Sequence, residues 1–356
     1  MAVSADYTAN LAADVVGLYQ DAEQILLQRI ARALAQDMDA PDWAERKLLQ
    51  VQLLQAQTVR QLRALSGRST EEISAAVLKA HNRGAALAES DLAALAARAT
   101  GVTAGLPPGL PAVERLVTET IVAIQSTHVG ILRAVDDVFR QVVARSAPQV
   151  LLGVQTRRQA AQAALNDFAK AGVKGFVDKS GRKLALESYV EMATRSATAR
   201  AAIDAHVERL QAGGHDLVIV SDHSQECKLC RPWEGKVLSL SGVARIDGVD
   251  VAGTLAQARS GGLFHPGCRH SIGIYLPGVT KAPTRTADPQ GDADRQKLRY
   301  LEREVRSSKR QAAVALDPEA KRLADARVRN YQSKIRSHVG STTAKRIPSR
   351  ERLGAL

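Results

Sequence analysis

Apolar residues recur three and four positions apart through most of this chain, and that spacing is typical of amphipathic helices. Near the start, Leu11, Val15, Leu18 and Ile25 fall on one helical face. Aromatic residues are only 3% of the 356 residues, so a core must be built from aliphatic side chains. Because sheets favour aromatic and β-branched residues, the sequence predicts a mainly α protein with long helices at both ends.

Glycine, proline and polar clusters divide the helical pattern into segments. Asp39 to Pro41 breaks the first helix, and residues 100–109 hold three Gly and two Pro. Ser69 and Glu72 have the spacing of a capping box, which predicts that a new helix opens there. Further helices are predicted over residues 112–146, 155–171, 188–211, 295–316 and 319–338, with a hairpin near 176–186.

The sequence changes character at Asp216. Two short apolar runs, Leu217–Val220 and Val237–Leu240, are interpreted as strands within a glycine-rich stretch. The fold class expected is therefore mainly α, with long helices around a small, loop-rich α+β unit. The predicted regions are an N-terminal helical region (1–100), a central helical region (110–215), a mixed α+β subdomain (216–280) and a basic C-terminal helix pair (292–340) with a short tail to residue 356.

Composition excludes several classes of protein. No stretch approaches the roughly 18 uninterrupted apolar residues of a membrane span, so no contact with a membrane is expected. The first residues lack the basic and apolar regions of a secretory signal. The three cysteines lie between positions 227 and 268, too few and too clustered for a secreted disulfide scaffold. We therefore expect a soluble protein made in a reducing cytoplasm.

Positive charge is concentrated towards the C-terminus. The formal net charge is +12, and residues 281–356 hold 19 Lys and Arg against 9 Asp and Glu, a net of +10. Such helices can neutralise phosphates and bind nucleic acid without reading its sequence. The alternative is a solvated helix face with pairs such as Glu302 and Arg306. The side chains expected to contact nucleic acid are Arg295, Lys297, Arg299, Arg303, Arg306, Lys309 and Arg310.

All the cysteines take part in one pattern that suggests metal binding. Cys227 and Cys230 form a Cys-x-x-Cys turn, and His265 and Cys268 follow after a gap of 34 residues. Three thiolates and one imidazole match the ligand sets of structural zinc, and sulfur-rich coordination disfavours magnesium and calcium. The sequence therefore predicts Zn²⁺ bound by these four side chains. Neighbouring His223 or His270 could replace the histidine of the set, or hydrogen-bond to a ligand.

Sequence alone leaves alternative chemistries open for the same side chains. The cysteines could be buried free thiols, a redox pair at Cys227 and Cys230, or part of a Cys–His nucleophile. A metal-dependent nuclease is a further alternative, with Asp222, His223 and Glu226 as candidates by proximity alone. The sequence holds no phosphate-binding glycine loop and no hydrolase or metalloprotease motif, so we expect no enzymatic activity.

Several segments resemble the phage minor capsid protein 2 family. The most specific are Trp233–Gly242 (WEGKVLSLSG) and Gly267–Gly278, taken together. Residues 18–27, 189–195 and 295–310 are also similar to segments of that family. The Cys-x-x-Cys pair is not a general feature of the family, and with the His-Pro-x-Cys-Arg piece it is closer to the related MuF-type head morphogenesis proteins. The zinc prediction thus rests on the residues themselves.

The resemblance implies a structural role as a low-copy head protein of a tailed phage. Its expected place is the virion, in the capsid interior or at the portal vertex. Its expected partners are the portal protein and the major capsid or scaffold protein, with double-stranded DNA as a further candidate. Some relatives carry a C-terminal toxin domain, which the roughly 75 residues after Gly278 are too few to form here. A metal-dependent nuclease and a plain nucleic-acid-binding protein remain the alternatives.

Overall fold

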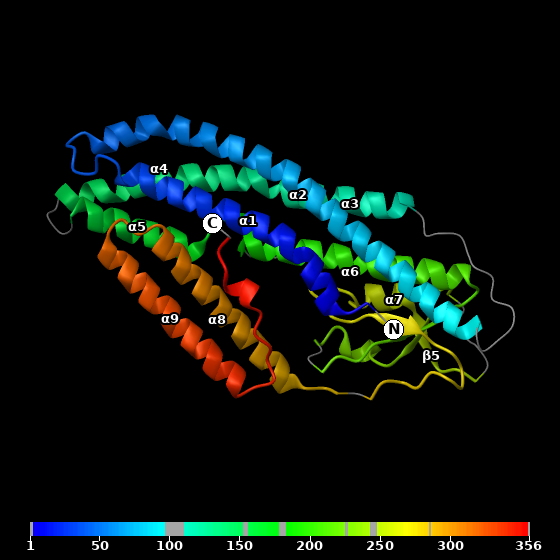
Figure 1. The fold of residues 1–356 in the computed structure, drawn as a ribbon. Helices are drawn as coiled ribbons and strands as arrows, with labels where there is room; N and C mark the ends of the chain where they lie inside the picture. The colour runs from blue at the N-terminus through cyan, green and yellow to red at the C-terminus, as the bar shows by residue number, and fades with distance from the viewer. Residues whose placement is uncertain are drawn as a thin grey trace. The chain divides into compact units, whose positions relative to one another are not determined.

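A computed structural model describes the protein over residues 3–96, 110–151, 156–177, 183–224, 227–242, 248–284 and 286–354. Most of these residues are helical and a small sheet accompanies them, which confirms the predicted fold class (Figure 1). The chain separates into two compact units, each assembled from three stretches. Unit 1 consists of Met1–Asp14, Glu71–Val122 and Glu191–Ala293, and unit 2 of Val15–Thr70, Ala123–Val190 and Asp294–Leu356.

Two long helices form the N-terminal part of the chain. α1 (Ala5–Ala35) ends before the predicted break and α2 (Trp43–Ala96) begins after it. The prediction of a new helix at Ser69 is wrong, because α2 runs through this residue. Its hydroxyl donates to the carbonyl oxygen of Ser66 at 3.1 Å, a backbone bond that serine can make inside a helix. The predicted break at 100–109 lies outside the described residues.

The predicted helix over 112–146 is in fact two helices, α3 (Leu110–Gln125) and α4 (Thr127–Leu151). At the junction the hydroxyl of Thr127 donates to the carbonyl oxygen of Ile124 at 2.6 Å. Such a side-chain bond competes with the backbone ladder, and the apolar spacing on both sides continues past the junction. Periodicity alone therefore does not reveal where one helix ends and the next begins.

A hairpin separates the two helices that follow. α5 (Arg157–Ala171) begins after a capping box at Thr156, and α6 (Leu186–Ala212) is the longer of the two. Between them β1 (Lys174–Val177) pairs antiparallel with β2 (Lys183–Ala185), which confirms the predicted hairpin. Its turn lies outside the described residues.

The sheet of unit 1 has the strand order β5-β4-β3-β6. β3 (Leu217–Val220) and β4 (Val237–Ser239) are the two predicted strands, and they pair antiparallel. β6 (Ile272–Ile274) lies antiparallel on the other side of β3, whereas β5 (Val251–Thr254) runs parallel to β4. α7 (Leu255–Ser260) follows β5 directly. These last elements are too short to show a period in the sequence.

The strands pack with α2, α6 and α7 around an aliphatic core that includes Leu92, Leu210 and Val218. Cys230 belongs to the same buried cluster, so one of the predicted metal ligands lies at the core boundary. α2 and α6 approach each other closely at Gly84, where a Cβ atom would lie 2.0 Å from the carbonyl oxygen of Ala202. Only glycine permits this approach.

The basic helix pair consists of α8 (Pro289–Ala313) and α9 (Pro318–Gly340), which lie side by side and antiparallel (Figure 1). Asp317 caps α9 by accepting a hydrogen bond from the backbone N–H of Ala320 at 2.8 Å. Two short 3₁₀ turns complete the described elements, η1 (Arg231–Trp233) and η2 (Pro348–Glu351). The residues packed between the two helices are Leu298, Leu301, Val305, Val328, Tyr331 and Ile335.

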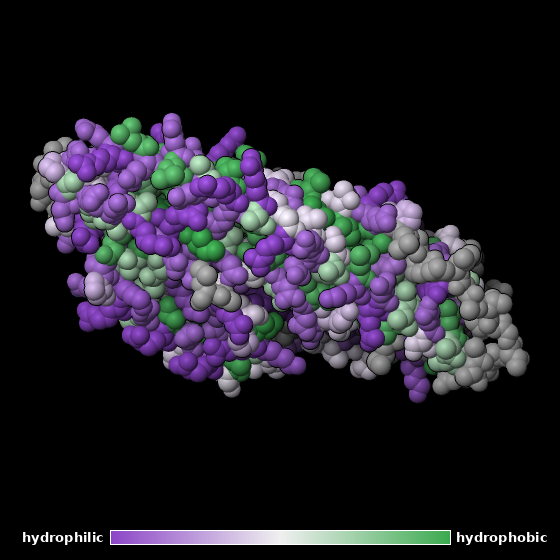
Figure 2. All heavy atoms as spheres, turned by 45° about the horizontal axis from the view of Figure 1, so that its top comes forward, coloured by the Kyte–Doolittle hydropathy of each residue, from purple (hydrophilic) through white to green (hydrophobic). Residues whose placement is uncertain are grey.

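Hydrophilic side chains cover most of the face drawn in Figure 2, and hydrophobic side chains occur there in small separate groups. Within the part of the chain that the structure describes, no helix combines the length and the hydropathy needed to cross a membrane.

Candidate metal centre

Two turns of unit 1 carry the predicted zinc ligands. In the connection from β3 to β4, the backbone N–H of Cys230 donates to the carbonyl oxygen of Cys227 at 3.2 Å. In the connection from α7 to β6, the N–H of Cys268 donates to the carbonyl oxygen of His265 at 2.9 Å. Each short-range pair seen in the sequence is thus one tight turn, and both turns border the same sheet.

The donor atoms of these turns lie close together. Cys227, Cys230 and His265 form one group, and Cys230, Cys268 and His270 form another, each with all its donor atoms within 4.8 Å of one another. The separations are 3.0 Å for Cys227 Sγ to His265 Nε2, 3.5 Å for Cys230 Sγ to Cys268 Sγ and 3.4 Å for Cys268 Sγ to His270 Nδ1. Ligands of a tetrahedral zinc ion lie roughly 3.6–3.8 Å apart, so this donor set fits a metal ion.

Glu234 is a residue of this site that the sequence analysis missed. Its carboxylate accepts hydrogen bonds from Nε2 of His270 and from the backbone N–H of His223. The side chains of His270 and Glu234 are only 3% and 4% exposed. With Nε2 held by a carboxylate, Nδ1 of the ring faces Cys268, which is the arrangement by which proteins orient a metal-binding histidine. No short spacing reveals the pair, because 36 residues separate its members.

The two core-side thiols are electrostatically unequal. The hydrogen bond from the Cys230 thiol lowers the pKa of Cys268; burial opposes this shift, and bonds from His270 add to it. The same contact raises the pKa of Cys230. Cys268 is therefore the thiolate of the pair, and the thiolate is the form of cysteine that binds metal.

His223 and the acidic residues near it lie differently from the ligand candidates. The ring of His223 lies 6.1 Å from that of His270, and it belongs to neither donor group among the described residues. Asp222 accepts a hydrogen bond from the N–H of Thr286 at 3.1 Å. Glu226 lies outside the described residues. Among the residues that the structure describes, neither Asp222 nor His223 belongs to a group of three donors that could hold a metal ion.

A cavity of about 350 Å³ opens beside the donor cluster. Cys268 and His270 form part of its wall, and apolar side chains such as Ile203 and Leu263 line much of the rest. Phe264 also lines it, with φ of 61°, a backbone conformation that L-residues rarely adopt. Because Cys268 and His270 face this cavity, a metal ion can reach their donor atoms without disrupting the core.

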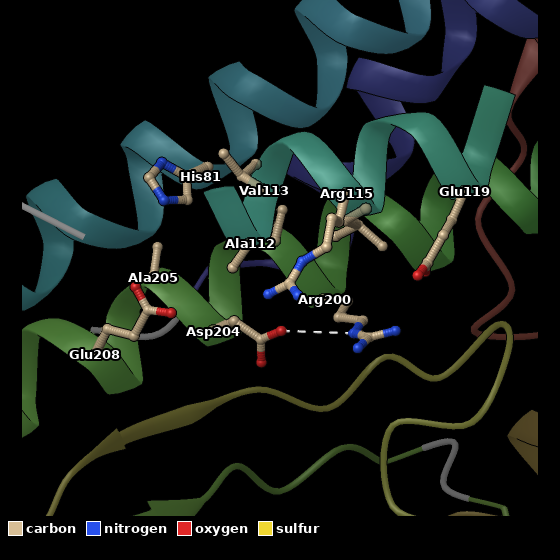
Figure 3. Close-up of a pocket in the computed structure, with 11 residues that line it drawn as sticks. His81, Ala112, Val113, Arg115, Glu119, Arg200, Asp204, Ala205 and Glu208 are labelled. Carbon is tan, nitrogen blue, oxygen red and sulfur yellow. Dashed lines mark ion pairs between the residues drawn. The ribbon is translucent and has the colours of Figure 1, made fainter. Parts of the chain in front are cut away.

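A second cavity in unit 1, of about 210 Å³, lies between α3 and α6, with His81 of α2 at one side (Figure 3). Arg115 and Glu119 of α3 and Arg200 and Asp204 of α6 line it. Arg200 and Asp204 pair with each other at 3.5 Å. Since acidic and basic groups alternate around it, the lining favours no ligand of a single charge.

Two of the predicted nucleic-acid contacts are buried in unit 2. Nε of Arg306 donates to Oε1 of Glu187 at 2.6 Å, and Nη1 of Arg310 lies 3.6 Å from carboxylate oxygens of both Glu187 and Glu23. Arg306 is 8% exposed and Arg310 4% exposed. We therefore remove both from the side chains expected to contact phosphate, because their guanidinium groups fasten α8 to the rest of the unit.

The other predicted contacts are more accessible. Lys297 and Arg303 are exposed, whereas Arg295, Arg299 and Lys309 are half-buried. Arg299 pairs with Glu302 at 3.0 Å, and Nζ of Lys309 donates to the carbonyl oxygen of Glu351 at 2.7 Å. Most of the basic residues of α8 that were predicted to contact nucleic acid therefore already interact with other residues of the protein.

Comparison with known proteins gives a consistent result. The model of the family described as phage minor capsid protein 2 matches residues 3–340. A structural protein of Lactococcus phage LL-H is 27% identical over 213 residues, which are 57% of this chain and 57% of that relative. The match therefore spans little more than half the length of the curated relative. No solved structure matches the fold.

Proposed function

Because the chain belongs to the phage minor capsid protein 2 family and is thus a structural protein of the bacteriophage virion, we propose that it acts in assembly of the head, close to the portal. The proposed partners are the portal protein and the major capsid or scaffold protein, with packaged double-stranded DNA as a further contact. The strongly basic helix pair supports a place near the DNA, since positive charge relieves repulsion between protein and phosphate.

The proposed role of the Cys/His cluster is that of a structural zinc site. The proposed ligands are Cys227, Cys230, Cys268 and one imidazole, from His265 or His270. The observation that carries the proposal is that these donors form two groups of three across two turns, which share Cys230 and each have their donor atoms within 4.8 Å of one another. When bound, zinc would join the turn after β3 to the turn before β6. The strands there are only three or four residues long, so such a link adds stability that the small sheet lacks.

Metal analysis of the full-length protein tests the site. We expect one zinc ion per chain and a lower melting temperature after treatment with a chelator. Cys230→Ser should lose the ion, whereas His215→Ala, a histidine change outside the cluster, should retain it. Zinc content of His265→Ala and His270→Ala identifies the imidazole ligand. Protein that holds no zinc and melts at the same temperature with chelator would remove the proposal.

Particle assembly tests the role in the head. Phage that lacks this protein should produce few filled heads, and chemical cross-linking of normal particles should join the protein to the portal. Normal heads in its absence, or particles that do not contain the protein, would contradict the proposal. We also propose that the cluster is passive and not catalytic. Metal-dependent cleavage of DNA that His223→Ala abolishes would favour the nuclease alternative instead.

A further inference from the structure

One side of α9 carries arginines at seven-residue intervals. Arg322, Arg329 and Arg336 are all exposed. Seven residues return to almost the same side of a helix, about 20° short of two turns, and they rise about 10 Å along the axis. The three side chains, called the arginine row from here on, therefore follow one line along α9. The row lies on the side away from Ala324 and Ile335, which are buried.

The arginine row is not neutralised by nearby carboxylates. Across the described residues, no ion pair involves Arg322, Arg329 or Arg336. The acidic residues of α9 are Glu319, in its first turn, and Asp325, which pairs with Lys321 at 2.8 Å. The guanidinium groups of the row are thus available to a partner.

The exposed charged side chains of the helix pair and the segment after it are almost all basic. Over residues 294–354, ten Lys and Arg are exposed, and the exposed acidic residue there is Glu319. Glu302 and Glu351 are buried, each paired with an arginine, and the other carboxylates there are half-buried. Burial withdraws acidic and basic side chains in similar numbers, and the charged side chains left exposed are almost all basic.

We propose that the arginine row of α9 is a contact surface for duplex DNA that binds phosphates without reading the base sequence. This inference rests on the proposed function, because a protein in the phage head would lie near packaged DNA, which is a polyanion. Arginine suits the task because its planar guanidinium can bind a phosphate through two hydrogen bonds. The spacing of about 10 Å is close to the major-groove width of about 12 Å, so neighbouring arginines can reach phosphates on both strands.

The residues between the arginines favour DNA over an acidic protein partner. Ala326 and Ser333 lie on the same side of α9 as the row, and Asp325, which pairs with Lys321, lies at its edge. Protein interfaces are anchored by large aromatic or aliphatic side chains, and single-stranded nucleic acid stacks on aromatic rings. This side of the helix offers instead one hydroxyl and one small side chain, which let a sugar–phosphate backbone approach closely.

A charge-neutral variant of the full-length protein tests the surface. In Arg322→Gln/Arg329→Gln/Arg336→Gln, each lost phosphate contact should lower the slope of log affinity against log salt by about 0.9, or about 2.7 for all three. Binding to a short duplex is measured by fluorescence anisotropy at several salt concentrations. Circular dichroism checks that the variant keeps its helices, which we expect because the substituted side chains are exposed. Duplexes of unrelated sequence should bind alike.

The same helix offers a matched control. Lys321→Gln/Arg327→Gln/Lys334→Gln removes the same three charges from other sides of α9, where each side chain already contacts Asp325, Gln311 or Tyr331. We expect this variant to lower the salt slope by less than about 1.

Three results would overturn the assignment. These are an equal loss in both triple variants, an unchanged slope in the row variant, and tighter binding of an acidic polypeptide or single-stranded DNA than of duplex. Failure of the proposed function has a different readout, because it would appear as absence of the protein from phage heads and not as a change in DNA binding.

Discussion

Replacing Glu187 with leucine should destabilise unit 2 strongly, because Arg306 would lose its buried carboxylate partner. The two residues are 5% and 8% exposed, and their charged atoms lie 2.6 Å apart. Removing one member of such a pair costs about 3–5 kcal/mol, since the remaining charge stays buried and uncompensated. Arg306 keeps a hydrogen bond to the carbonyl oxygen of Arg350, and Arg310 keeps Glu23. We therefore expect the lower end of that range, about 3 kcal/mol.

An exposed ion pair of similar length serves as the control. Lys321 and Asp325 lie 2.8 Å apart, but their side chains are 61% and 38% exposed. Asp325→Leu should therefore change the free energy of unfolding by no more than about 0.5 kcal/mol. With a urea dependence of about 2 kcal/mol/M, Glu187→Leu should lower the unfolding midpoint by about 1.5 M and Asp325→Leu by less than about 0.3 M. Far-UV circular dichroism reports both transitions.

Equal midpoints for the two variants would refute the reasoning that burial makes the Glu187 pair important. A second test removes both charges. The double variant Glu187→Leu/Arg306→Met should recover part of the lost stability, because no unpaired charge is left at that position. If the double variant is as unstable as the sum of the single changes, the contact between these side chains is not the cause.

Other predictions concern the helices and the C-terminal segment. Gly84→Ala should cost about 1–3 kcal/mol by forcing two helices apart, whereas Gly67→Ala, with nothing within 4 Å of its Cβ, should gain up to about 1 kcal/mol in urea unfolding. Asp317→Ala should cost about 1 kcal/mol in the same assay through loss of the cap of α9. Burial raises the pKa of Glu351, but hydrogen bonds, chiefly from Arg346, outweigh it and leave the pKa below the ordinary value of 4.5. The thermal stability advantage of wild type over Glu351→Gln should thus be present above pH 4.5 and vanish as the pH falls below it.

Local sequence patterns predicted the long elements of this fold well. Helical periodicity and the Asp317-Pro318 break predicted α8 and α9 nearly in full. The predicted helix boundaries were wrong at two places where a side-chain hydroxyl bonds to the backbone. Ser69 bonds back into a continuous helix, and Thr127 bonds across a junction, although both residues are common at helix ends. The spacing of residues in the sequence does not determine to which backbone carbonyl a hydroxyl donates its hydrogen bond.

The candidate site shows the same limit. The Cys227–Cys230 and His265–Cys268 pairs were visible because each is a turn of four residues. Glu234 lies within the distinctive segment Trp233–Gly242, but its role in the site was not visible because its partner His270 is distant in sequence. Charge counting likewise assigned Arg306 to a nucleic-acid surface, although its partner lies 119 residues earlier in the chain.

The interleaving of the two units has a consequence for biosynthesis. Unit 2 needs Asp294–Leu356, the last of its three stretches to emerge from the ribosome. Until that stretch arrives, Glu23 and Glu187 lack the guanidinium groups that balance them, and so a nascent chain cannot bury these carboxylates favourably. Partly synthesised chains should stay open and exposed to proteases, because contacts so distant along the polypeptide form late. Chains truncated before these helices should therefore be degraded before they can accumulate.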